Sequence, residues 1–253
     1  MKPGLAFAAG ALLVAAALAI EAPAGLVDGR VAAATDGRLR ITDTSGTLWN
    51  GAGELVLLPS GARRPMAWHI DAWPLLFGEL RGTIATAMDA PQYAEFAYGH
   101  RSMQLHRLDV ALPMDSLLQS VGVPAALGSA GGSIEARIAR FVQTPGALDA
   151  DLAAQWRNAS LPALRPGFRI LLGDVRAEAR GTGPEIAGSI SNVGGDVEIA
   201  GRVALSAALI PKIDATIRPR AGIDRDRAEA ITTALSLIGS PDGQGGYRLA
   251  WPR

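Results

Sequence analysis

The two residues best placed by type and spacing to do chemistry are His69 and Asp71. If the segment around Trp68 is a β-strand, both side chains lie on one face, where a carboxylate could orient an imidazole as a general base. The same spacing is typical of an ordinary solvated strand face, which is the more common case. Neither His100 nor His106 adds an HExxH or HxH pattern, so zinc has no support. We therefore assign no catalytic and no metal-binding residue.

Other chemical motifs are missing from the sequence. It holds no GxSxG elbow, no Walker A loop and no GxGxxG turn. The paired carboxylates Asp149 and Asp151 fall on the polar side of an alternating segment, and there is no cysteine for a thiolate site or a disulfide. Lys and Arg number 24, as do Asp and Glu, so charge gives no argument for nucleic acid. We predict a protein that is not an enzyme and needs no cofactor.

The tryptophans are the more informative aromatic residues. Trp49 lies in the segment Ser-Gly-Thr-Leu-Trp-Asn-Gly, Trp68 and Trp73 flank the stretch His-Ile-Asp-Ala, and Trp156 lies near the end of an alternating segment. One interpretation makes them core residues at bends of a sheet. The other makes Trp49, Trp68, Trp73 and Trp156 an apolar groove or a contact for a partner or a lipid.

The elements that would position these residues are mainly β-strands. Apolar and polar residues alternate with period two in 148–157, 174–180 and 212–218, which is typical of antiparallel strands with one solvated face. The same alternation marks the segments 39–41, 68–70, 103–112, 133–141, 196–206 and 247–251. In 103–112 the apolar phase slips between Leu105 and Leu108, which predicts a bulge near His106 and Arg107.

These patterns predict a curved antiparallel β-sheet, a meander, with one or two short covering helices. The inward residues are often Ala, Val or Ile, and a sheet faced with such small residues is compatible with tight curvature or with an open trough. Helices are expected over 113–121 and 225–238. For the second, Asp224 is the expected N-cap and Gly239 the stop.

The N-terminus carries an uncharged apolar run, residues 4–20, preceded by Lys2. As a helix it would span about 25 Å, slightly less than a hydrocarbon core of about 30 Å. The run predicts either an uncleaved membrane anchor or a signal peptide, since Ala17-Leu18-Ala19 and Ala22-Pro23-Ala24 both fit a cleavage site. Under both interpretations, the rest of the chain is exported across the membrane. We expect an anchor segment, 1–24, and an exported β-rich domain, 25–253.

Several segments, taken in order, resemble one protein family. After the apolar run come Ser-Gly-Thr-Leu-Trp-Asn-Gly at 45–51, a Trp-rich strand with Pro-Leu-Leu at 68–76, and Gly-rich strands at 131–157. Ile-Ser-Asn-Val-Gly-Gly-Asp-Val-Glu-Ile-Ala-Gly follows at 190–201, then 234–241 and 246–249. Together they resemble protein N of the bacterial type II secretion system, also called general secretion pathway protein N.

The resemblance implies a single-pass protein of the bacterial inner membrane, held through residues 4–20, with the bulk of the chain in the periplasm. It implies partners among the other secretion subunits of the inner membrane and periplasm, and it brings no catalytic residue. We expect a non-enzymatic accessory subunit that helps export folded proteins across the outer membrane, docked by strand addition at a sheet edge or through its periplasmic face. The alternative is an AsmA-like periplasmic protein that binds or transfers lipid in an apolar trough.

Overall fold

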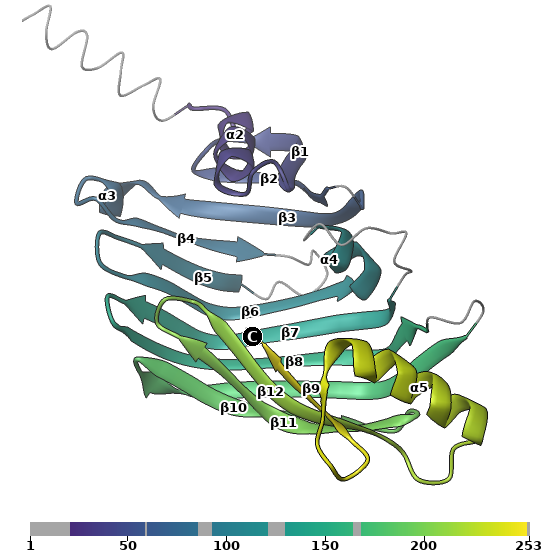
Figure 1. Ribbon diagram of the computed structural model, residues 1–253. Helices are drawn as coiled ribbons and strands as arrows, with labels where there is room; N and C mark the ends of the chain where they lie inside the picture. The colour runs from purple at the N-terminus through teal and green to yellow at the C-terminus, as the bar shows by residue number, and fades with distance from the viewer. Residues whose placement is uncertain (1–20, 59, 86–92, 121–129, 164–167, 252–253) are drawn as a thin grey trace, which may run out of the picture. The chain divides into compact units, whose positions relative to one another are not determined.

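The computed structural model describes residues 21–58, 60–85, 93–120, 130–163 and 168–251 (Figure 1). They form two compact units that divide between Tyr93 and Ala94, and each unit is described by itself. The predicted anchor, residues 4–20, lies outside the described residues. Among the described helices, none is long and apolar enough to cross a membrane. The predicted division into 1–24 and 25–253 stays a prediction.

The first unit is a small antiparallel sheet with one helix packed on it (Figure 1). Its elements are α2 (Gly25–Ala34), β1 (Leu39–Gly46), β2 (Asn50–Leu57), β3 (Ala62–Asp71), α3 (Ala72–Leu75) and β4 (Leu80–Ala85). The strands pair in chain order. Ile41 and Trp68 are buried on one face of the sheet, and Val27 and Val31 of α2 pack against them. This small core holds α2 on the sheet.

Helix α2 also closes the outer edge of β1. The carboxylate of Asp28 accepts hydrogen bonds from the backbone N–H of Ile41 at 2.7 Å and from the guanidinium of Arg40. The hydroxyl of Thr35 accepts from the N–H of Leu39 at 3.1 Å. Side chains from the helix thus occupy edge donors that an added strand would need. Strand addition by a partner is therefore disfavoured at this edge.

The second unit is a longer antiparallel meander. Its strands are β5 (Tyr93–Tyr98), β6 (Met103–Pro113), β7 (Gly131–Thr144), β8 (Ala147–Pro162), β9 (Arg169–Gly183), β10 (Glu185–Val193), β11 (Val197–Ser206), β12 (Pro211–Pro219), β13 (Ser240–Pro241) and β14 (Tyr247–Trp251). They are ordered as in the chain, except that β14 pairs with β12 and β13 lies outside it. The helices are α4 (Met114–Ser120) and α5 (Arg225–Ile238). The mainly β prediction and the meander are confirmed.

The second unit curves strongly toward its apolar face. The side-chain amide of Gln143 in β7 donates to the carbonyl of Ala207, just after β11, at 3.0 Å, although three strands separate β7 from β11 in the sheet. Leu148 and Ile186 are fully buried in the core cluster at this end. A Cβ at Gly188, in the middle of β10, would overlap the carbonyl oxygen of Glu178 in β9. Glycine is needed there because neighbouring backbone fills the space above it.

A second core cluster lies beneath α5. Ile231 and Leu235 of the helix are buried against Leu172, Val197 and Ile199 of the sheet. The predicted cap is confirmed, because the carboxylate of Asp224 accepts from the N–H of Arg227 at 2.8 Å. The helix does end before Gly239. That glycine has an extended backbone, with φ of −126°, rather than the left-handed conformation common after helices.

The phase slip in β6 corresponds to a local irregularity. Arg107 has a φ of +57°, and Leu105 and Leu108, on either side of it, pair with Phe141 and Ile138. The pairing of β7 with β8 shifts between Ile138 and Arg140. Both strands therefore change phase at the same level of the sheet, which returns their apolar side chains to one face.

Candidate functional site

The predicted tryptophans of the first unit lie in different environments. Trp68 is 5% exposed, and its indole N–H donates to the carbonyl of Leu48 at 3.0 Å. Its ring lies directly against the backbone of Gly51, where a Cβ would overlap it. Trp49 is half-buried, and its carbonyl accepts from the N–H of Ile70 at 2.7 Å. Trp68 is thus a core residue, and Trp49 lies beside the end of β3.

Trp73 is the exposed member of the set. It lies in α3, the turn between β3 and β4, and is 72% exposed. Its ring meets that of Phe77 edge to face, with centroids 6.5 Å apart. Leu76 and Phe77 are as exposed as Trp73, and Leu75 is partly so. Apart from this turn, the first unit exposes large apolar side chains only singly among its described residues, so the turn is its main apolar surface.

Trp156 belongs to the second unit and packs beside the core cluster under α5. Its indole N–H donates to the carbonyl of Gly131 at 2.8 Å. The ring therefore fills the end of the sheet where β7 begins, and the hydrogen bond satisfies its polar edge. Of the four predicted residues, Trp73 alone presents most of its ring to solvent.

His69 and Asp71 do lie on one face, as predicted, with Nε2 and Oδ1 3.1 Å apart. The other ring nitrogen, Nδ1, is 2.5 Å from the amide oxygen of Asn50. Both side chains are about half exposed. A general base needs a free nitrogen within reach of its substrate proton, and here both ring nitrogens contact neighbouring side chains. The geometry is that of a surface polar cluster.

The most elaborate polar site lies at the turn from β10 to β11, in the segment 194–197. Gly194 and Gly195 have φ of +75° and +78°, so the chain reverses through two consecutive left-handed residues. A Cβ at Gly195 would overlap the backbone of Leu172 and Gly173 in β9. The turn can therefore lie directly on β9 because it has no side chains there.

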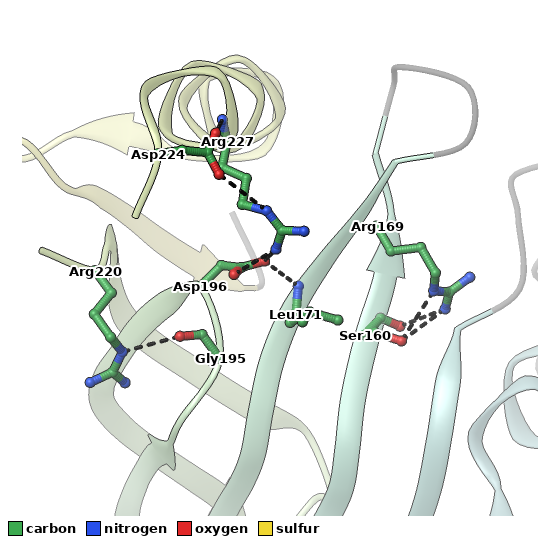
Figure 2. Close-up of polar contacts among 8 residues, drawn as sticks. All are labelled: Ser160, Arg169, Leu171, Gly195, Asp196, Arg220, Asp224 and Arg227. Carbon is green, nitrogen blue, oxygen red and sulfur yellow. Dashed lines mark hydrogen bonds and ion pairs between the residues drawn. The ribbon is translucent and has the colours of Figure 1, made fainter. Parts of the chain in front are cut away.

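Asp196, which follows the glycines, joins three elements (Figure 2). Its N–H donates to the carbonyl of Leu171 at 2.7 Å, and its carboxylate accepts from the Leu171 N–H at 3.0 Å. Both carboxylate oxygens also accept from Nη1 of Arg227 on α5, at 2.9 and 2.8 Å. Its carbonyl accepts from the N–H of Arg220, after β12. One residue thus ties β9 and the end of β12 to α5.

The second arginine completes the site from the other side. The guanidinium of Arg220 donates to the carbonyls of Gly194, Gly195 and Val197 at 3.1 to 3.2 Å. The side-chain amide nitrogen of Asn192 donates to the carbonyls of Leu172 and Val197, and its amide oxygen accepts from the N–H of Ile199.

Chemically, this network fixes structure and offers no reactive group. Asp196 is 7% exposed, and its oxygens are occupied by one guanidinium and one backbone N–H. Among the described residues, every buried side-chain nitrogen or oxygen has a hydrogen-bond partner. No cluster of three or more His, Cys, Asp or Glu among them could hold a metal ion.

Two features go beyond the sequence prediction, which named only Trp73 of the exposed apolar turn and nothing of the Asp196–Arg227 pair. The exposed apolar turn had a signal, because Trp-Pro-Leu-Leu-Phe at 73–77 is an apolar run between polar strand ends. For the Asp196–Arg227 pair the sequence carries only a partial signal. An Asp after two glycines indicates a turn, but it does not indicate which residue the carboxylate binds.

The model of the family described as Type II secretion system (T2SS), protein N matches residues 37–250, which span both units. No curated protein matches the chain, and no solved structure does.

Proposed function

The chain belongs to the type II secretion system protein N family, and from that premise we propose that it is a non-enzymatic accessory subunit of the secretion machine. It helps the machine export folded proteins across the outer membrane. The observation that carries the proposal is the family match over residues 37–250.

Residues 4–20 anchor the subunit in the bacterial inner membrane, and residues 25–253 lie in the periplasm. The support is in the sequence: the run is uncharged, Lys2 precedes it, and the positive flank stays on the cytoplasmic side. The first unit then follows the anchor directly.

The partner contact we propose is the open part of the β14 edge. Strand β13 pairs only with Tyr247 and Arg248, so Leu249, Ala250 and Trp251 have no neighbouring strand on that side within the described chain. Trp251 is 52% exposed. An extended segment of another secretion subunit would gain main-chain hydrogen bonds there. By contrast, side chains of α2 cap the edge of β1 in the first unit.

A pocket at this end of the sheet gives the edge its selectivity. It has a volume of about 330 Å³ and is lined by Val203, Ile213 and Trp251, among others. Val203 pairs with Ile213, and Ile213 with Trp251, so the three lie in one row on one face. An apolar side chain of the added strand would enter this pocket.

Affinity capture of the full chain from membranes of its own host tests the proposal. We expect other type II secretion subunits to co-purify with the wild-type chain. Trp251→Lys places a charge on the proposed edge and should reduce their recovery severalfold. The control is Val193→Lys, at an exposed apolar residue that ends β10, away from the proposed edge, and this variant should capture the subunits as the wild type does. Recovery of no secretion subunit by the wild-type chain would refute the accessory role.

Lipid carriage is the second candidate, and one feature of the second unit favours it. On the apolar face Ala154 lies opposite Ala136 and Ala177, and Gly201 lies opposite Ala215, while Ile190 occupies the same row between Ala177 and Gly201. The small residues on either side of Ile190 form shallow parts of this face, which are compatible with an acyl chain. Native mass spectrometry of the purified chain should then show a bound phospholipid, and a lipid-free spectrum under gentle extraction would exclude this candidate.

A further inference from the structure

The turn between β3 and β4 is an exposed apolar tip, which we define as Trp73, Leu75, Leu76 and Phe77. Three of these side chains are 71 to 74% exposed, and Leu75 is 39% exposed. The chain reverses at Gly78, where φ is +76°, and β4 then pairs Arg81 with Asp71. The exposure of these side chains places them outside the core of the first unit.

The N-terminal segment joins the first unit at the β1–β2 turn. The carbonyl of Ala22 accepts from the N–H of Leu48 at 2.7 Å, and the N–H of Ala24 donates to Gly46 at 3.3 Å. Pro23 forms a bridge with Thr47 between these bonds. Residues 22–24 are therefore fixed beside that turn.

The strand register brings the apolar tip to the same end of the sheet. Asn50, the first residue of β2, pairs with His69 near the end of β3, and the N–H of Ile70 donates to the carbonyl of Trp49. Helix α3 begins two residues later (Figure 1). Neighbouring strands are about 4.8 Å apart, so across the sheet the β3–β4 turn and the N-terminal entry point are separated by roughly two strand spacings, and the tip extends further along the strand direction. Leu58 lies at the opposite end of β2.

We propose that the apolar tip inserts into the interfacial layer of the membrane that holds residues 4–20. The inference rests on the anchor of the proposed function. Only Glu21 separates Ile20 from the fixed residue Ala22, so the membrane surface would lie within about 7 Å of this end of the sheet. The tip therefore contacts membrane lipid rather than a protein partner.

The composition of the tip fits an interface rather than the bilayer core. Trp and Phe with neighbouring Leu are the side chains that bind between headgroups and acyl chains. The base of the tip is polar, with His69 and Asp71 on β3 and an ion pair between Glu79 and Arg81 on the way into β4. Those groups would remain among the headgroups, which limits insertion to the turn itself. The result is a second point of attachment that fixes the orientation of the first unit.

A single spin label tests the insertion, because the chain has no cysteine of its own. The full chain carrying Phe77→Cys is labelled and reconstituted into vesicles of phosphatidylethanolamine and phosphatidylglycerol. We expect the label to collide severalfold more with oxygen, relative to a soluble nickel complex, than a label at Leu58→Cys. Leu58 is the control because it lies at the other end of the same sheet and is partly exposed.

A second measurement leaves Phe77 in place. Quenching of tryptophan fluorescence by brominated lipid should be strong in the wild-type chain and should fall markedly in Trp73→Tyr, which keeps an aromatic ring in the turn. The insertion would be overturned by two results together: equal quenching in the wild type and in Trp73→Tyr, and labels at residues 77 and 58 that are equally accessible to the soluble nickel complex.

The outcomes separate the tip from the anchor. If the chain floats with the vesicles while the label at residue 77 stays aqueous, insertion is refuted and the anchor stands. A label that is aqueous in pure lipid but shielded in native membranes would assign the tip to a protein partner, which also refutes insertion. If the chain does not float at all, the anchor fails and the insertion fails with it.

Discussion

Asp196, in the turn after β10, holds the guanidinium of Arg227 in α5 with both carboxylate oxygens, at 2.9 and 2.8 Å. The helix thereby contacts the sheet at the residue before β11, where Asp196 also hydrogen-bonds Leu171 of β9. Arg227 stacks over the ring of Phe168, with its guanidinium carbon 5.2 Å from the ring centroid, which covers the pair from one side. This contact fixes the N-terminal end of α5, while Ile231 and Leu235 fix its middle.

Arg227→Met should lower the free energy of unfolding of the second unit by about 2 kcal/mol, because it leaves a largely buried carboxylate with only one backbone donor. Chemical denaturation followed by circular dichroism measures it. Arg225→Met is the control on the same helix: its ion pair with Glu229 is exposed, so the change should cost less than about 0.5 kcal/mol. Equal effects of the two substitutions would contradict the role given to the Asp196–Arg227 pair.

Gly188→Ala should destabilise the second unit by about 2 kcal/mol or more, because the added methyl overlaps the backbone of β9. Ser189→Ala changes the next residue of the same strand, whose side chain is exposed, and should stay within about 0.5 kcal/mol of the wild type. Thermal unfolding compares the two. A Gly188→Ala chain as stable as Ser189→Ala would show that the strands are not so closely apposed.

The two tryptophans of β3 and α3 should differ sharply when truncated. Trp68→Ala removes a core ring and should cost the first unit about 3–5 kcal/mol. Trp73→Ala removes a ring that is 72% exposed and should cost less than about 0.5 kcal/mol. Hydrogen exchange of backbone amides in β2 and β3 reports the stability of the first unit alone. Similar exchange in both variants would refute these assignments.

The contact between α2 and β1 should weaken in acid. Hydrogen bonds from Arg40, and then from the N–H of Ile41, hold the pKa of Asp28 below its ordinary value of 3.8. A lowered folded-state pKa stabilises the protein above the ordinary value, and that stabilisation is lost as the pH falls through the folded-state value. Asp28→Asn should therefore cost about 1 kcal/mol at neutral pH. The difference from the wild type should shrink below pH 3.8, and an unchanged difference in acid would contradict this.

Strands with clean alternation were predictable, because one solvated face imposes period two on the sequence. Lys212 to Arg218 and Leu148 to Arg157 both lie inside the strands observed, β12 and β8. No strand is predicted over the residues of β10, because Gly188 contributes no apolar side chain to an alternating pattern. In the structure that glycine is in mid-strand, where close apposition of backbone and not a turn requires it.

The candidate sites were less predictable, because they depend on contacts between residues distant in the chain. The sequence indicates neither that Asp196 meets Arg227 nor that residues 22–24 lie at the same end of the sheet as Trp73. Trp68 and Trp73 have the same residue type and similar neighbours in sequence. Their burial differs because one lies on the core face of β3 and the other in a turn beyond its end.

The central claim is that this chain serves the export of folded proteins, and a secretion assay in the host with its gene deleted tests that most directly. The account predicts that folded type II substrates accumulate in the periplasm and fall in the medium, and that the full chain restores their release. Proteins retained in the periplasm of the wild type should be unaffected. Normal release of those substrates by the deletion strain, with the rest of the machine intact, would contradict the account.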